Sequence, residues 1–559
     1  MLRWATPVLL ALLLVTTLLG LAVALLPAFG FFPAVGGTGF TLAHWQELAQ
    51  VPGLGHSIRV SLLAGLVTPA ISLATVFLFL ASASGSVLDS WIRRLVSPVL
   101  AIPHAAAAFG LAFLIAPSGF LFRLVSPTLS GWERPPDLLI VNDTWGISMI
   151  VGLIVKEVPF LLLMCLAALP QIAPADRVRL ARSLGYRPTV AWLKVVAPAL
   201  YPLIRLPLLA IIAFSSATVD VALILGPTLP PTLSVMLLDW FNDPDLQQRF
   251  LAGAAAVLQL GLSLIVIGCW LLAERMVRGI YRRWIVSGNR RGGHRVLSTG
   301  GRIGLPAVVA IMLVSLLVLM INSFSGLWQF PHTLPGDWTL QAWVRVLPGL
   351  AEPLANTLVI AVLATGCSLL LVVGSLEYDF RQKKKSGLAR WVLYIPLVIP
   401  QVVFLFGLVV FTESMQWQPG LVLVICAHVL LVIPYTYLTL ADPYRRLDPR
   451  WLHTAATLGA SPASAFRRVR LPLLLGPLLT SAAVGVAISV SLFLPTQLAG
   501  AGRVNTITTE AVALASGGNA SIIAVWALLQ ALLPMLVFVL ALAAPVIVWR
   551  HRKGMQAFR

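Results

Sequence analysis

Three ionisable side chains stand inside long apolar stretches of this 559-residue chain, and they are the residues best placed to do chemistry. Lys156 and Glu157 are adjacent and come just before Pro159, whereas Asp220 follows a short run of serine and threonine. A lone charge at the centre of a lipid bilayer costs ~3 kcal/mol or more, so such charges usually pair or line a pathway. We expect Lys156 to pair with Glu157 or Asp220 between helices. The pair could serve the passage of a solute, or it could only fix helix packing.

The matching stretch in the second half of the chain carries hydroxyls instead of charges. Ser489 and Ser491 could line a polar path, and they could equally bond across helices. The chain contains no GxxxxGK(S/T) nucleotide-binding sequence, no HExxH zinc motif and no cluster with metal-ligand spacing. We therefore expect no catalytic site, no metal and no cofactor bound by this chain. If it moves a solute against a gradient, the energy comes from an ion gradient or from a partner.

The composition is typical of a protein embedded in a membrane. Hydrophobic residues make up 59% of the chain and charged residues 11%, against about 25% charged in soluble proteins. Apolar stretches of ~20 residues, the length that crosses a bilayer as a helix, recur throughout. We expect an all-α polytopic membrane protein with about 12 transmembrane helices in two homologous six-helix halves. The spans are expected near residues 7–32, 57–81, 94–117, 145–169, 203–226, 251–273, 303–325, 355–376, 391–412, 419–440, 473–495 and 521–549.

Lysine and arginine are distributed unevenly over the expected loops, and this distribution predicts the orientation. With the N-terminus inside, Lys156 falls within a span and 32 of the 39 basic residues lie on the inner side. Both termini are then expected in the cytoplasm. The net charge of +19 marks cytoplasmic loops rather than a nucleic-acid partner. The outer loops hold only six arginines: Arg59, Arg123, Arg134, Arg249, Arg345 and Arg503.

One stretch of the chain occurs twice, at residues 181–198 and 455–472, with a constant offset of 274 and no gap. Seven of the 18 positions are identical, and self-similarity of this kind indicates a duplicated unit. The residues that we assign to the two copies are Ala181, Leu184, Gly185, Pro188, Ala191, Trp192, Val195 and Pro198, and Ala455, Leu458, Gly459, Pro462, Ala465, Phe466, Val469 and Pro472.

The repeat predicts a short helix-turn-helix on the inner surface. A glycine, Gly185 or Gly459, ends the first helix because it accepts the left-handed cap conformation. A proline three residues later, Pro188 or Pro462, suits the first turn of a second helix. The apolar residues at positions 191, 192 and 195, and their counterparts in the copy, fall on one face of this second helix. We expect that face to be offered to another protein, and the closing prolines to break the helix before the next span.

Two weaker marks support the duplication of the chain. Ile102-Pro103-His104 with Gly110 matches Ile399-Pro400-Gln401 with Gly407, at an offset of 297. Val158-Pro159-Phe160 matches Ile433-Pro434-Tyr435, at an offset of 275. The two offsets differ, so a loop insertion must separate the marks.

A basic stretch at residues 276–302 joins the two halves. It is rich in arginine and glycine, which is typical of a flexible linker whose charges can touch anionic lipid headgroups. We expect a first half at 1–275 with its loop at about 170–198, and a second half at 303–559 with its loop at about 441–472.

The repeated loop resembles the EAA loop of ABC-importer permeases. That pattern is Glu-Ala-Ala, three residues, Gly, nine residues, Ile, one residue and Leu-Pro. The repeat keeps the third alanine, the glycine and the final proline, with valine at the isoleucine position. The glutamate position holds Arg179 in one copy and His453 in the other. The whole chain is similar to the fused permeases of the thiamine and ferric-iron importer group, and residues 156–160 and 508–510 resemble its Ynj-type branch.

The resemblance implies a type I ABC-importer permease, which is a membrane subunit and not an enzyme. Each loop would dock a coupling helix on one of two cytoplasmic ATPase subunits, and those subunits would bind the ATP. A periplasmic or lipid-anchored solute-binding protein would deliver the solute. The chain would lie in the bacterial inner membrane, in contact with membrane lipids.

Two other functions stay open on the residues alone. An ion-coupled secondary transporter would use Lys156, Glu157 and Asp220 as a relay. A membrane enzyme or lipid-handling protein would need a convergent catalytic set, which the sequence does not show. The repeated loop favours the importer permease, because a proton-driven carrier does not require it. The solute is left open: thiamine, a metal complex, a polyamine and an inorganic anion all fit.

Overall fold

We describe the chain from a computed structural model that covers residues 2–290, 293–382 and 387–550. These residues are mostly helical, which confirms the expected all-α fold, and a short antiparallel pair, β1 (Phe31–Phe32) and β2 (Gly37–Thr38), is the main exception. Within the described ranges, ten helices are long and apolar enough to cross a membrane. The number rises to 12 if each of two bent helix pairs counts as one span.

The helices of the first half are α1 (Leu2–Ala28), η1 (Pro33–Val35), α2 (Ala43–Gln50), α3 (Leu54–Ala83), α4 (Val87–Leu100), α5 (His104–Ile115), α6 (Phe120–Val125), α7 (Ile147–Ala168), η2 (Leu169–Ile172), α8 (Pro174–Ser183), α9 (Pro188–Ala191), η3 (Trp192–Val196), α10 (Ala197–Ala217), α11 (Asp220–Leu225), α12 (Leu233–Asn242) and α13 (Gln248–Val286). Most of the segment expected as a flexible linker is also helical, because α13 runs on to Val286 and the next helix starts at His294.

The helices of the second half are α14 (His294–Ser323), α15 (Gln341–Arg381), α16 (Gly387–Val398), α17 (Gln401–Ser414), α18 (Leu421–Arg446), α19 (Arg450–Thr457), α20 (Pro462–Ala465), η4 (Phe466–Arg470), α21 (Leu471–Leu473), α22 (Leu475–Ser491), α23 (Phe493–Gly500), α24 (Ile507–Ala513), η5 (Leu514–Ser516) and α25 (Ala520–Val548).

The third expected span, at 94–117, is not one helix. It divides into α4 and α5 at Ile102-Pro103, and the ninth expected span divides in the same way into α16 and α17, which meet at 97°. Proline lacks a backbone N–H and pushes the preceding residue away from helical geometry, so each Ile-Pro pair ends a helix. The prediction of an unbroken third span is therefore wrong. The duplicated Ile-Pro pair marks a break in each half.

Each half is held by the first helix of the other half. α1 packs along α15 and α17 of the second half, and α14 packs along α3 and α5 of the first. A Cβ atom added to Gly407 of α17 would collide with the Gly20 carbonyl oxygen of α1. A Cβ added to Gly110 of α5 would meet the Ser315 carbonyl oxygen of α14 at 2.9 Å. Small residues permit such close crossings in membranes, so the glycine of the weaker repeat mark has a packing role in both halves.

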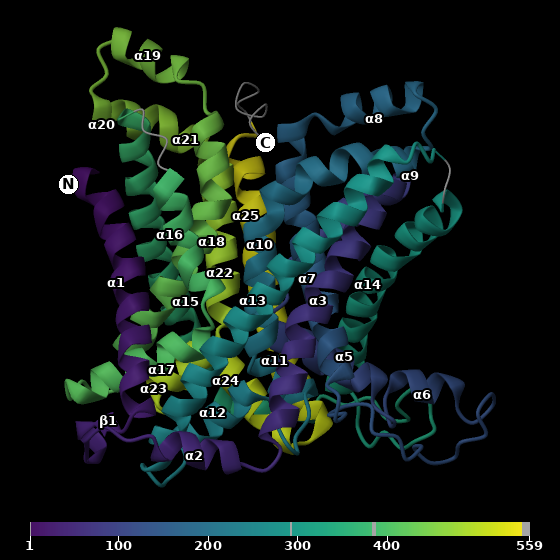
Figure 1. Ribbon diagram of the computed structural model, residues 1–559, viewed down its shortest axis with the longest axis vertical. Helices are drawn as coiled ribbons and strands as arrows, with labels where there is room; N and C mark the ends of the chain where they lie inside the picture. Colours follow the sequence, from purple (N-terminus) through teal and green to yellow (C-terminus); the bar gives the residue numbers. More distant parts are fainter. Residues whose placement is uncertain (1, 291–292, 383–386, 551–559) are drawn as a thin grey trace.

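The two repeated loops lie at one end of the helical bundle. Figure 1 shows α8 and α9 on one side of that end and α19 and α20 on the other, well apart. The start of α1 and the end of α25 lie at the same end, which we call the loop end (Figure 1). α2, α6 and β1 lie at the opposite end. The loops and the ends of the first and last helices therefore share one side of the bundle.

At the opposite end, two arginines of the first half bind the second half. Arg249 of α13 forms an ion pair with Glu413 of α17, with 2.5 Å between Nη1 and Oε2. Arg123 of α6 donates three hydrogen bonds of 2.9–3.1 Å to backbone carbonyls at residues 328–332, in the segment after α14. The halves are thus joined at this end of the bundle.

We predict that Gly407→Leu destabilises the protein strongly, because the side chain would force α1 away from α17. Overpacking a tight contact costs about 1–3 kcal/mol or more. The purified chain should lose its monodisperse size-exclusion peak at a temperature several degrees below that of the unsubstituted protein. Gly366→Leu is the matched control, because a Cβ at Gly366 of α15 meets no atom within 4 Å. Equal heat stability of the two variants would contradict the close crossing.

Candidate functional site

Both copies of the repeat fold as two short helices around a glycine; we call residues 174–198 the first loop and residues 450–474 the second loop. Gly185 has φ +86° and Gly459 has φ +79°, the left-handed conformation that glycine adopts at little cost. In each copy the residue after the glycine donates its N–H to the carbonyl of the alanine five residues before it, Ala181 at 3.3 Å or Ala455 at 2.9 Å. This is the Schellman arrangement. The predicted glycine cap is confirmed in both loops.

The second helix of each loop starts at the expected proline, Pro188 or Pro462, and continues through a π-helical turn, η3 or η4. The first copy runs on through Pro198 into α10, so the prediction that Pro198 ends the helix is wrong. In a π-helix the N–H of residue 198 would donate to the carbonyl of residue 193, but proline has no N–H. The Tyr281 hydroxyl of α13 donates to the Leu193 carbonyl instead. In the second copy the chain bends by 72° just after Pro472.

The apolar face of the second helix is not offered to a partner, and that prediction is wrong. Ala191 and Trp192 are buried, and the Trp192 ring meets Phe77 of α3 edge-on with 5.6 Å between ring centroids. The other residues of this face are buried or half-buried as well: Val195, Ala465, Phe466 and Val469. Helical periodicity shows which residues share a face, but here the face packs against the protein's own helices.

The exposed apolar residues of the loops belong to the first helix of each copy and its cap. Leu180 of α8 and Leu184 just after it are 68% and 58% exposed. Trp451 of α19 and Leu458 just after it are 47% and 82% exposed. Leu184 and Leu458 occupy the same repeat position, so each loop presents the same kind of apolar surface at the loop end.

The first loop is fastened to the last part of α13. The ammonium of Lys194 lies 4.8 Å from the ring centroid of Trp284 in α13 and 5.1 Å from that of Tyr186 in the loop. The same Nζ donates to the Ile285 carbonyl at 3.4 Å. The N–H of Arg187 donates to the Arg290 carbonyl, 3.2 Å away. The first loop is therefore attached to the end of its own half.

The second loop is fastened by a different cation, to α15. Arg470 is fully buried, and its Nη1 lies 2.5 Å from Oε2 of Glu377. The Tyr444 hydroxyl of α18 donates to the same oxygen, and Arg381 pairs with the other carboxylate oxygen at 2.6 Å. The Arg470 guanidinium also lies over the Phe380 ring, with its central carbon 3.5 Å from the ring centroid. The position equivalent to Arg470 in the first loop is a valine, so the two fastenings are unrelated.

Within the described residues Lys156 forms no ion pair with Glu157 or Asp220, so the predicted pairing between helices is wrong. Its ammonium donates to the backbone carbonyls of Leu100, at 2.8 Å, and of Ile102. These carbonyls end α4 at the break before α5, where they lack helical partners. The sequence could not show this role, because the break was not expected. Lys156 therefore satisfies the backbone of a broken span.

Glu157 faces the interface between the two halves. Its Oε1 lies 3.3 Å from Nε2 of His104, the first residue of α5. Tyr435 of α18 in the second half interacts electrostatically with the same carboxylate. The Glu157 side chain is 7% exposed and that of His104 is 23% exposed. His104 was missed in the sequence, although it belongs to a repeat mark and lies in an apolar run.

Asp220 and Ser491 are bonded locally. Asp220 is the first residue of α11, past the end of α10, and the Thr218 hydroxyl donates to its carboxylate at 3.1 Å. Ser491 donates to the Ile488 carbonyl of its own helix at 2.8 Å. Neither contact joins distant helices.

Ser489 bonds across helices to a buried histidine that the sequence analysis missed. His428 of α18 is 2% exposed, and its two ring nitrogens lie 2.9 Å from the Ser489 hydroxyl and 3.0 Å from the Thr496 hydroxyl. Thr357 and Thr506 line the same small hollow. A histidine inside an apolar run was the available signal. The contact ties α18 to both segments of the broken span α22–α23.

No group of three or more His, Cys, Asp or Glu side chains that could hold a metal ion occurs in the described part of the chain. The four cysteines are free thiols, and Cys165 is the buried one among them. The repeated loops and the charges between the halves are therefore the features that a function has to explain.

These features agree with the known proteins to which the chain is similar. The family described as "binding-protein-dependent transport system inner membrane component" matches residues 371–548. The inner membrane ABC transporter permease protein YnjC of Escherichia coli (strain K12) is 31% identical over 512 residues, which cover 91% of each chain. The chain therefore belongs to the inner-membrane permeases of binding-protein-dependent ABC transporters. It is a membrane permease subunit of an ABC importer, as the repeated loop implied.

Two further relatives match parts of the chain. The putative 2-aminoethylphosphonate transport system permease protein PhnV of Salmonella typhimurium is 27% identical over 207 residues, covering 35% of this chain and 76% of PhnV. The spermidine/putrescine transport system permease protein PotC of Escherichia coli (strain K12) is 27% identical over 177 residues, covering 30% of this chain and 64% of PotC. Each match spans about a third of this chain, whereas the YnjC match runs through both halves.

We predict that Arg470→Met loosens the second loop and leaves the first loop unchanged. Removing one partner of a buried ion pair costs about 3–5 kcal/mol, because the other charge stays buried. Hydrogen–deuterium exchange at residues 450–474 should become markedly faster, with little change at 174–198. Arg467→Met is the matched control, because Arg467 lies on the same π-helical turn and is exposed. The fastening is refuted if both variants exchange alike.

Proposed function

We propose that this chain spans the bacterial inner membrane with its loop end in the cytoplasm and forms the whole transmembrane part of the importer. Two cytoplasmic ATPase subunits dock on it, one at each loop. A periplasmic or lipid-anchored binding protein delivers the solute at the opposite end. The ATPase subunits bind and hydrolyse the ATP, and this chain contributes no nucleotide, catalytic, metal or cofactor site.

The repeated exposed leucines are the observation that supports docking most directly. Leu184 and Leu458 occupy one position of the repeat, and the helices that they follow, α8 and α19, lie at the same end of the bundle in Figure 1. Burying a leucine side chain contributes about 1.5–3 kcal/mol to an interface. Two equivalent surfaces on one chain suit two copies of one partner. The docking residues are therefore on and just after α8 and α19, with Ala181, Ala455 and the glycine caps holding these helices in place.

Each docking surface is connected to membrane helices. The first loop continues into α10 without a break, and the second loop is tied to α15 through Arg470 and Glu377. When ATP draws the two ATPase subunits together, the loops approach each other. For the opposite end to open as the loop end closes, the contacts of Arg123 and Arg249 that join the halves there have to break. The free energy for this change lies in loop contacts that differ between the two states.

We place the solute path between the halves, beside Glu157. This carboxylate comes from the first half, Tyr435 comes from the second, and His104 beside them is partly exposed. Lys156 and Ser489 act on this path indirectly, because their polar groups bond to a broken backbone and to His428. Asp220 and Ser491 would affect this path at most by stabilising the local segments in which their side chains are bonded.

We predict that Leu184→Asp and Leu458→Asp each remove one ATPase subunit from the complex. A carboxylate in place of a leucine that the ATPase subunit would cover loses the apolar contribution and adds a desolvation cost. The affinity for the ATPase subunit at that loop should therefore fall about 100-fold or more. The measurement is the native mass of the complex formed with the ATPase subunit that co-purifies with the unsubstituted chain. We expect two ATPase subunits on the unsubstituted chain, one on each single variant and none on the double variant.

The matched control is Leu129→Asp, because Leu129 is 82% exposed and follows α6 at the opposite end of the bundle. It should keep both ATPase subunits. Retention of two subunits by the double variant would refute docking at these loops. Uptake that follows a proton gradient without any ATPase would instead support the ion-coupled carrier.

A further inference from the structure

The last span of the first half is far longer than a membrane requires. α13 has 39 residues, which at 1.5 Å per residue make a helix about 58 Å long, against about 30 Å of bilayer hydrocarbon. Its last part, Glu274–Val286, follows the apolar residues that cross the membrane, and we call it the α13 extension. Figure 1 shows that the helix is tilted, so that its end lies near the level of α9 and of the start of α1. The extension therefore lies at the membrane boundary.

One face of the α13 extension is occupied by the first loop. Tyr281 donates to the loop backbone, Trp284 lies against Lys194, and Ile285 accepts from the same lysine. These contacts fix how the helix is turned about its axis. The remaining faces point away from the protein.

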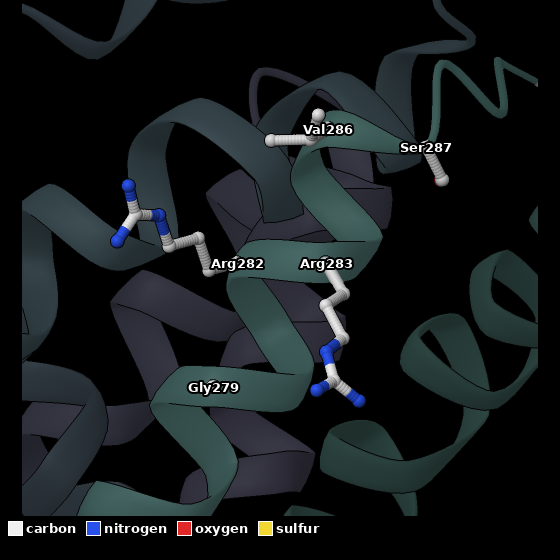
Figure 2. Close-up of a pocket in the computed structure, with 5 residues that line it drawn as sticks. All are labelled: Gly279, Arg282, Arg283, Val286 and Ser287. Atoms are coloured by element: carbon white, nitrogen blue, oxygen red, sulfur yellow. The ribbon is translucent and has the colours of Figure 1, made fainter.

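The free face of the extension carries a shallow hollow lined by guanidinium groups. Gly279, Arg282, Arg283, Val286 and Ser287 surround about 460 Å³ of open space. Figure 2 shows the two arginine side chains extended in different directions, Arg282 away from the helix on one side and Arg283 down toward the level of the turn that contains Gly279. A Cβ at Gly279 would meet no atom within 4 Å, so the hollow reaches the helix backbone. The five residues are spaced at i, i+3, i+4, i+7 and i+8, as one face of a helix requires.

Within the part of the chain that the structure describes, no acidic side chain pairs with Arg282 or Arg283. Residues 275–302 contain eight arginines and no acidic residue. Glu274, the acidic residue that precedes them, is already held by Arg205 at 2.9 Å and by the Tyr201 hydroxyl at 2.5 Å. Guanidinium groups bind phosphate through paired hydrogen bonds. The hollow therefore suits a phosphate group.

Apolar side chains beside the arginines identify the kind of phosphate. Met276, Val277 and Ile280 of the same extension are 72%, 57% and 67% exposed. Large apolar side chains interleaved with arginines are typical of a helix at a membrane surface. A free phosphate ion or a nucleotide would leave these side chains in water. The acyl chains of a lipid would cover them.

We propose that the free face of the α13 extension binds the phosphate headgroup of an anionic phospholipid from the inner leaflet. Arg283 holds the phosphate at the hollow, Arg282 adds positive charge beside it, and the acyl chains run along Met276 and Ile280. Only the assignment to the inner leaflet rests on the proposed orientation of the chain. Because the opposite face holds the first loop, the lipid steadies that loop and not the second one.

The test is lipid binding by the purified full chain in nanodiscs without any ATPase subunit. The probe is a spin-labelled phosphatidylglycerol in phosphatidylcholine. We expect Arg282→Gln/Arg283→Gln to weaken its binding about 10- to 30-fold, since each basic residue near an anionic surface contributes to the affinity. Gly279→Leu keeps every charge and fills the hollow, so it should weaken binding as well while the helical circular dichroism is unchanged.

Arg467→Gln/Arg468→Gln is the matched control, because it removes two exposed arginines of the second loop. It should change binding less than twofold. An equal loss in the control would show that only net charge matters, and unchanged binding in Gly279→Leu would show that the hollow is not used. Displacement of the probe by millimolar inorganic phosphate would identify a free-phosphate site, and equal binding of spin-labelled phosphatidylcholine would remove the headgroup preference. Each of these outcomes would overturn the proposal.

Discussion

Backbone groups inside a membrane must find partners within the protein, and this constraint shapes the whole molecule. The spans of both halves are broken near Ile-Pro pairs and near the ends of α10 and α22, so each break exposes carbonyls without helical partners. Lys156 serves two of them, and the hydroxyls of Ser234 and Thr508 serve the Thr218 and Val490 carbonyls. Ser234 and Thr508 are 274 residues apart, the offset of the repeat. Residues that look functional in the sequence are thus partly needed to allow irregular backbone at membrane depth.

The two halves share their topology but differ in how their loops are held. Lys194 and the end of α13 hold the first loop, whereas Arg470 and Glu377 hold the second. The capping glycines, the starting prolines and the exposed leucines are the same in both copies. A duplicated chain has therefore kept the surface that a common partner would contact and has changed the internal contacts behind it. The two loops have equivalent outer surfaces, but their contacts with the membrane helices differ.

Local features could be predicted from the sequence, and contacts between distant segments could not. The approximate positions of the spans follow from apolar length, and Gly185 and Pro188 act as predicted because caps depend on neighbouring residues. The pairing of Lys156 was wrong because its partners are carbonyls released by a break that hydropathy does not reveal. The prediction of which loop face is exposed was wrong, because periodicity shows that Ala191 and Trp192 share a face but not what covers that face. Arg470 was missed because its role depends on Glu377, 93 residues earlier in the chain.

The exchange of first helices has a consequence for how the protein is made. α1 leaves the ribosome first, but α17, on which it crosses at Gly20, begins about 370 residues after α1 ends. At synthesis rates of about 5–20 residues per second, α1 waits roughly 20–75 s for that partner. Its neighbour from its own half, α13, also begins late, about 220 residues after α1 ends. Release of the first half alone would leave α1 with one face against lipid, so biogenesis, and not only transport, gives a reason to keep both halves on one chain.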